Sequence, residues 1–134
     1  MYKAKITREH RTAFIILCDR SGSMAEETRF GGQVMRKAEA VACIINMLLG
    51  ELIHRSRRDD GIRDYFDIAV LGYSGSGVQP LLPAGDRERF IGIGDLVRLP
   101  APVQQRRMLR TLPGGRRTAV EIGQRQWITP EANG

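Results

Sequence analysis

The sequence predicts an α/β fold in which a mixed, mostly parallel sheet is flanked by helices. Three observations support this prediction: a short apolar run at residues 12–18, a long amphipathic stretch from about Gln33 to Arg55, and two strand-like runs at 65–73 and 78–82. A strand, a crossover helix and a second strand form a parallel unit. The last run can then join this sheet as an antiparallel edge strand.

The first strand is predicted at residues 12–18, which read Thr-Ala-Phe-Ile-Ile-Leu-Cys. Its β-branched and aromatic side chains, without polar alternation, are typical of a strand buried on both faces at the centre of a parallel sheet. The run ends at Asp19, and the turn residues Ser21-Gly22-Ser23 follow. Open α/β sheets bind their ligands at such loops, beyond the carboxyl ends of the strands.

The helix predicted from about Gln33 to Arg55 carries an apolar stripe, because apolar residues recur at spacings of three and four. The members of this stripe are Val34, Ala38, Val41, Ile45, Leu48 and Leu52. A mixed-charge connector at 55–61 leads to the second strand at 65–73. The residues Ser74-Gly75-Ser76-Gly77 then predict the turn of a β-hairpin with 78–82.

The segment 84–127 is predicted to be an irregular, Arg-rich insertion that contains a possible hairpin. Glycines and prolines divide it into pieces too short for clear helices. Residues 96–99 and 118–122 are the runs that could form short strands. The length of 134 residues is enough for one core, so a single domain spanning 1–134 is expected.

The loop after the first strand places one carboxylate and two hydroxyls at alternate positions, Asp19, Ser21 and Ser23. Oxygen ligands that converge on one point suit a hard cation such as Mg²⁺ or Mn²⁺. Because both hydroxyls are neutral, the metal would stay electron-poor and would accept a carboxylate from a partner. The alternative is a purely structural Asp19 that caps a helix or forms a turn.

The run from Phe14 to Met24, Phe-Ile-Ile-Leu-Cys-Asp-Arg-Ser-Gly-Ser-Met, resembles the first strand and the metal-ion-dependent adhesion site (MIDAS) of von Willebrand factor A (vWA) domains. The D-x-S-G-S-M form is common in bacterial members, and the resemblance extends through the helix and residues 67–82. It implies a Rossmann-like vWA fold, direct coordination by Ser21 and Ser23, and coordination by Asp19 directly or through water. The family completes its site with a Thr and an Asp from later loops; Thr118 is the candidate Thr. Because no clear G-x-T or second aspartate loop follows the run at 78–82, we expect the chain to be the N-terminal portion of a longer vWA domain.

The resemblance implies a non-enzymatic protein–protein interaction domain that binds Mg²⁺ at this loop and an acidic residue of its partner. Two cysteines in apolar runs, Cys18 and Cys43, are expected to be buried free thiols, as in a cytoplasmic protein. No apolar run approaches the roughly 20 residues of a membrane helix.

Two alternative functions remain open from the sequence. One is a nucleic-acid-binding module, because residues 86–126 carry nine Arg and four acidic residues of a chain whose net charge is +6. Its candidate residues are Arg106, Arg107, Arg116 and Arg117. The other is a Mg²⁺-dependent phosphohydrolase that uses Asp19, although phosphoryl chemistry normally requires further acids or a lysine nearby.

Overall fold

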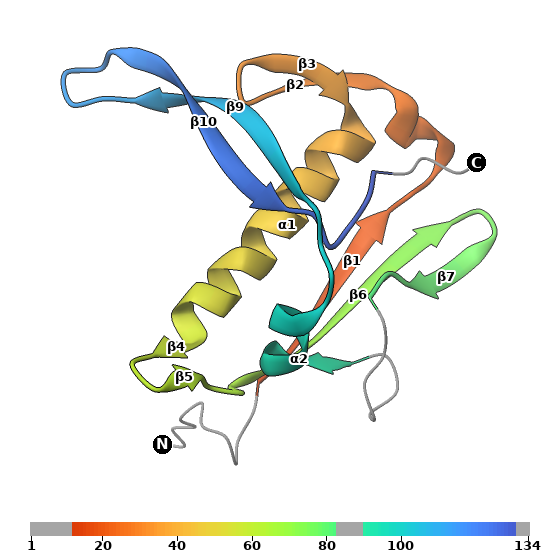
Figure 1. Ribbon diagram of the computed structural model, residues 1–134. Helices are drawn as coiled ribbons and strands as arrows, with labels where there is room; N and C mark the ends of the chain where they lie inside the picture. Colours follow the sequence, from red (N-terminus) through yellow and green to blue (C-terminus); the bar gives the residue numbers. More distant parts are fainter. Residues whose placement is uncertain (1–11, 83–89, 131–134) are drawn as a thin grey trace, which may run out of the picture.

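A parallel pair of strands belongs to the main sheet of the computed structural model, which describes residues 12–82 and 90–130 (Figure 1). Strand β1 (Thr12–Asp19) pairs in parallel with β6 (Phe66–Ser74), with Thr12 opposite Phe66 and Asp19 opposite Tyr73. On its other side β6 pairs antiparallel with β7 (Gly77–Pro80) and β8 (Ile91–Gly92). The predicted strand–helix–strand unit and the predicted hairpin are both confirmed, and the sheet is mixed. The prediction that it is mostly parallel is wrong, because within the described residues one pairing of this sheet is parallel and two are antiparallel.

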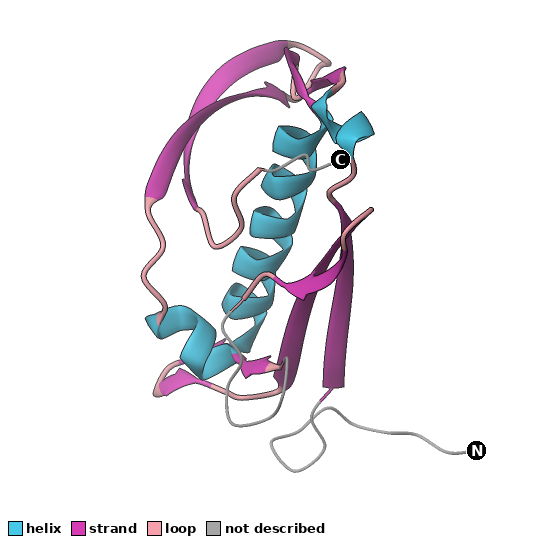
Figure 2. Ribbon diagram, turned by 90° about the vertical axis from the view of Figure 1, so that its right-hand side faces the viewer, coloured by secondary structure: helices cyan, strands magenta, loops and turns pink. Residues whose placement is uncertain are grey.

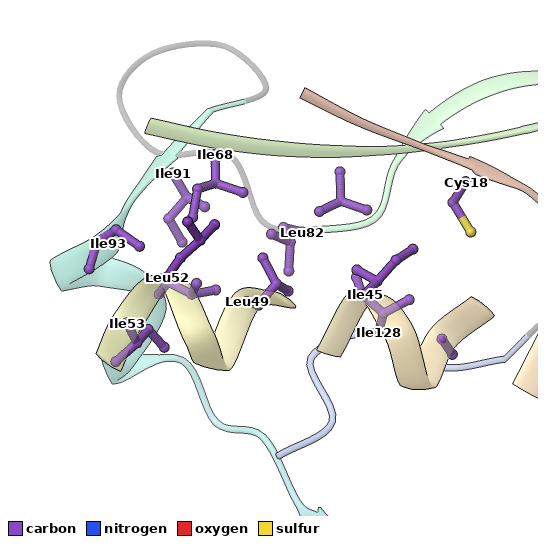
Figure 3. Close-up of a cluster of buried hydrophobic side chains, with 13 residues drawn as sticks. Cys18, Ile45, Leu49, Leu52, Ile53, Ile68, Leu82, Ile91, Ile93 and Ile128 are labelled. Atoms are coloured by element: carbon purple, nitrogen blue, oxygen red, sulfur yellow. The ribbon is translucent and has the colours of Figure 1, made fainter. Parts of the chain in front are cut away.

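Helix α1 (Lys37–Ser56) packs its apolar side against one face of this sheet (Figure 3). Its buried residues meet Cys18 of β1 and Ile68 and Val70 of β6. The helical members of this core are Ala42, Ile45, Leu49, Leu52 and Ile53. The predicted stripe is therefore slightly misplaced: Leu49 is fully buried, whereas Leu48 is exposed.

The helix begins four residues later than predicted because a small hairpin precedes it. Strands β2 (Glu27–Phe30) and β3 (Gln33–Arg36) pair antiparallel, and Val34 therefore lies in a strand. Gly31 and Gly32 connect them with φ angles of 62° and 81°. A two-residue turn with positive φ at both positions matches the twist of the strands and favours glycine. This hairpin follows the short 3₁₀ helix η1 (Gly22–Ala25).

The prediction that the first strand is buried on both faces is wrong. Ile15 is 60% exposed and Leu17 is 66% exposed, whereas Cys18 is buried. Successive side chains of a strand point to opposite faces, and α1 covers the face that carries Phe14, Ile16 and Cys18. Within the described residues, β1 is also an edge strand rather than a central one. A continuous apolar run in the sequence is therefore compatible with a strand that is buried on one face of the sheet and exposed on the other.

The segment 84–127 is more regular than predicted, although residues 84–89 lie outside the described part. The possible hairpin is confirmed as β9 (Val103–Thr111) paired with β10 (Arg117–Arg125). The strand predicted at 118–122 lies within β10. The strand predicted at 96–99 is wrong, because residues 93–98 form helix α2 (Ile93–Arg98). Ile93 and Leu96, three positions apart, are both fully buried, and this is a helical spacing.

Helix α1 lies between the sheet and the β9–β10 hairpin (Figure 2). A further short hairpin, β4 (Arg57–Arg58) with β5 (Gly61–Ile62), follows the helix. The segment after β10 returns to the core, where Asn46 Nδ2 donates to the Ile128 carbonyl and Ile128 N–H donates to Asn46 Oδ1, both at 2.9 Å. These bonds join the two sides of the molecule.

Cys18 and Cys43 are both buried and free, as predicted. Burial raises the pKa of the Cys18 thiol, with the nearby Arg20 charge acting in the opposite direction. Of the helices in the described ranges, none combines the length and the apolar character needed to cross a membrane.

Candidate metal centre

The predicted metal loop begins at the carboxyl end of β1, beside the end of β6. Asp19 is the last residue of β1 and lies opposite Tyr73 in the parallel register. The N–H of Arg20 donates to the Tyr73 carbonyl at 2.8 Å, which continues the sheet bonding one residue beyond the strand. The loop then turns into η1, in which Met24 N–H donates to the Ser21 carbonyl at 3.0 Å. The start of the loop is thus fixed to the sheet.

The three predicted ligand residues lie together in this loop. Ser21 N–H donates to Asp19 Oδ1 at 2.8 Å, and the hydroxyl oxygens of Ser21 and Ser23 are 3.0 Å apart. Neighbouring oxygens around Mg²⁺ are expected about 3.0 Å apart, since an octahedral ion holds each at roughly 2.1 Å. The two hydroxyls are joined by a hydrogen bond at this separation, which is compatible with that value. The donor set, one carboxylate and two hydroxyls, also fits a hard cation.

The carboxyl group of Asp19 remains ionised under mildly acidic conditions. The backbone N–H of Ser21 is the main cause that lowers the pKa of Asp19 below its ordinary value of 3.8, and the Ser21 side chain adds to the effect. Hydrogen bonds donated to a carboxylate favour its charged form. The loop therefore carries a fixed negative charge next to two neutral oxygens.

In residues 12–82 and 90–130, no three His, Cys, Asp or Glu side chains form a group that could hold a metal ion. Coordination at this loop would thus depend on the serine hydroxyls, with Asp19 as the carboxylate. Thr118, the candidate Thr from a later loop, lies in β10 opposite Arg110. Asp19 belongs to the four-stranded sheet and Thr118 to the separate two-stranded sheet. The structure does not join them in one sheet.

A second serine pair lies at the end of the neighbouring strand. Ser74 ends β6, its hydroxyl oxygen is 2.9 Å from that of Ser76, and Ser76 N–H donates to Ser74 Oγ at 3.3 Å. This pair has nearly the same hydroxyl spacing as Ser21 and Ser23, but its hydrogen bonds within the described residues include no carboxylate. The sequence showed both Ser-x-Ser patterns, but only the strand register reveals that they follow adjacent strands. The second pair is a natural internal control for the first.

The four arginines considered for nucleic-acid binding do not form one patch. Arg106 and Arg107 are consecutive in β9, so their side chains leave opposite faces of the hairpin. Arg106 Nε donates to Gln124 Oε1 at 3.0 Å, which holds it against the molecule. Arg107 lies opposite Glu121 in the register, while Arg116 and Arg117 lie at the turn end of the hairpin. Their charge is therefore distributed over two faces and one end.

Comparison with known proteins does not add a relative. No family model matches the sequence, and no curated protein and no solved structure matches the chain.

Proposed function

We propose that this chain is a metal-dependent protein-interaction domain that binds Mg²⁺ or Mn²⁺ at Asp19, Ser21 and Ser23. The observation that carries the proposal is the convergence of the Asp19 carboxylate, which accepts the Ser21 N–H, and the paired hydroxyls of Ser21 and Ser23 at the carboxyl end of β1. The resemblance of residues 14–24 to the vWA metal site supports the same assignment. It also leads us to propose a vWA-type, Rossmann-like fold and a cytoplasmic location.

The donor set of the loop favours a partner that supplies an acidic side chain. Two of the three groups are neutral hydroxyls, so Asp19 is the one anionic ligand among them. A bound divalent cation would keep a net positive charge and would polarise an incoming carboxylate. The loop follows the carboxyl end of β1, where its side chains are accessible: Ser23 is exposed, and Asp19 and Ser21 are half-buried. An Asp or Glu of another protein could therefore reach the site.

The two alternative functions have less support. A phosphohydrolase would use the same loop, but its chemistry would require further charged groups around Asp19. A nucleic-acid interface would require a continuous basic surface. The division of Arg106 and Arg107 between two faces does not favour such a surface.

The test is a titration with MgCl₂ and MnCl₂. Binding is measured by calorimetry and, for Mn²⁺, also by the loss of the electron paramagnetic resonance signal of the free ion. Wild type is expected to bind one equivalent, and Asp19→Ala or the double variant Ser21→Ala, Ser23→Ala is expected to bind none. The matched control is Ser74→Ala, Ser76→Ala, which removes an equivalent hydroxyl pair from the next strand. It is expected to bind like wild type. Equal binding by wild type and Asp19→Ala would exclude the metal assignment.

A further inference from the structure

A cleft of about 400 Å³ lies between α1 and the end of β10, away from the metal loop. Its size falls within the range of small-molecule sites in proteins. The residues that matter to its chemistry are Met47, Gly50 and Arg57 on the helix side, and Ile122, Arg125 and Trp127 on the other. None of these residues belongs to the proposed metal site.

Gly50 lies in the interior of α1, where glycine is unfavourable relative to alanine. A Cβ atom built on Gly50 meets no atom within 4 Å, so packing does not require a glycine at this position. The missing side chain instead leaves the helix backbone accessible from the cleft. A flat group could approach α1 more closely here than at any position that bears a side chain.

The cleft walls provide apolar surface with a fixed geometry. Met47 is 47% exposed and Ile122 is 39% exposed. The Arg125 guanidinium lies 4.6 Å from the ring centroid of Trp127, and the indole N–H donates to the Leu96 carbonyl at 3.3 Å. Arg125 Nη2 also donates to the Val97 and Leu99 carbonyls, at 3.1 and 2.9 Å. Trp127 and Arg125 are therefore held in place before any ligand arrives.

The charge of the cleft is positive. Glu51, its acidic residue, already forms an ion pair with Arg55 at 3.0 Å. In the part of the chain that the structure describes, neither Arg57 nor Arg125 forms an ion pair with a carboxylate. The bonds of Arg125 go to neutral carbonyls, which do not neutralise it. Two guanidinium groups that form no ion pair within the described residues thus border a cleft whose lining is partly apolar and partly polar.

We propose that this cleft binds a small amphipathic anion. Its flat apolar body lies over Gly50 between Met47 and Trp127, and its anionic group, a carboxylate or a sulfonate, pairs with Arg57 and Arg125. Guanidinium groups suit such anions because their donors can form paired hydrogen bonds with the oxygens. The apolar walls favour an aromatic or branched hydrocarbon body over a sugar or a nucleotide.

The test uses anilinonaphthalene sulfonate (ANS), whose flat rings carry one anionic group, and the full 134-residue chain. Trp127 is the single tryptophan of the sequence, so a ¹H–¹⁵N spectrum contains one indole signal that reports on the cleft. ANS is expected to shift this signal with a stoichiometry of one. Gly50→Leu fills the floor without a charge change and should weaken binding about tenfold or more, and Arg57→Gln about threefold to tenfold.

Two controls separate the cleft from other apolar surfaces and from charge effects. Leu17→Ser, on the exposed sheet face, should leave the binding constant unchanged. Neutral N-phenylnaphthylamine, which lacks the sulfonate, should bind wild type more weakly than ANS does. If Gly50→Leu fails to fold, Ile122→Phe narrows the cleft from the β10 side. An unmoved indole signal at saturation, or wild-type affinity in the cleft-filling variant, would overturn the proposal, as would equal binding of the neutral probe.

Discussion

Asn46 is the buried polar residue whose replacement by alanine should destabilise the fold most clearly. Its side chain is 2% exposed and forms a pair of hydrogen bonds with the backbone N–H and carbonyl of Ile128, each at 2.9 Å. Alanine removes both partners and leaves two backbone groups without hydrogen bonds in a buried position. Each such group costs about 1–2 kcal/mol, so Asn46→Ala should lower the free energy of unfolding by roughly 2–4 kcal/mol. This is a large part of the 5–15 kcal/mol typical of a domain.

The assay is urea unfolding at equilibrium, followed by the fluorescence of Trp127 and by far-ultraviolet circular dichroism. The urea concentration at the unfolding midpoint should fall. The m-value, which is the slope of the unfolding free energy against urea concentration, should stay the same, because the surface exposed on unfolding hardly changes. Glu51→Ala is the matched control on the same helix. It removes an exposed ion pair with Arg55, and such pairs contribute about 0–1 kcal/mol. An effect of Asn46→Ala no larger than that of Glu51→Ala would refute the reasoning.

Three further predictions follow from single residues. Gly50→Ala should raise the free energy of unfolding by about 0.5–1 kcal/mol in the same urea assay, because the added methyl meets open space in a helix interior. Gly32→Ala should instead destabilise by about 1–3 kcal/mol, visible as a lower thermal midpoint, since φ is 81° and the new Cβ would clash with Leu109. Because the pKa of Asp19 lies below 3.8, its carboxylate is ionised above that pH and becomes protonated only as the pH falls through the lowered value. Calorimetric Mg²⁺ affinity should therefore be equal at about pH 7 and pH 5; a marked loss by pH 5 would contradict the role of the Ser21 hydrogen bonds.

The elements that local pattern determines were predictable from the sequence. Strand β1, most of helix α1 and the β6–β7 hairpin follow from apolar periodicity and turn residues, which act over a few neighbours. The contacts within the Asp19 loop are equally local, since the hydrogen bond to Ser21 spans two residues. These features require no knowledge of distant parts of the chain.

The features that were missed depend on contacts distant in sequence. Residues 93–98 form a helix because Ile93 and Leu96 are both buried in the core, which a short Gly-containing segment does not reveal. Ile15 and Leu17 are exposed because α1 packs on the opposite face of the sheet. An apolar run does not reveal whether other elements pack on one face of the sheet or on both. The cleft beside Gly50 exists only because β10 lies along α1, about seventy residues later in the sequence.

The bond between Asn46 and Ile128 joins residues 82 positions apart, and this separation has a consequence for synthesis. At roughly 5–20 residues per second, a ribosome needs about 4–16 s to extend the chain from one partner to the other. For most of that interval all residues of α1 are already synthesised, but the Ile128 backbone that completes its buried side does not yet exist. Until Ile128 is added, the Asn46 side chain therefore lacks the two backbone groups that it pairs with in the folded protein. Closure of the core is a late event in the production of the protein, set by translation as well as by folding.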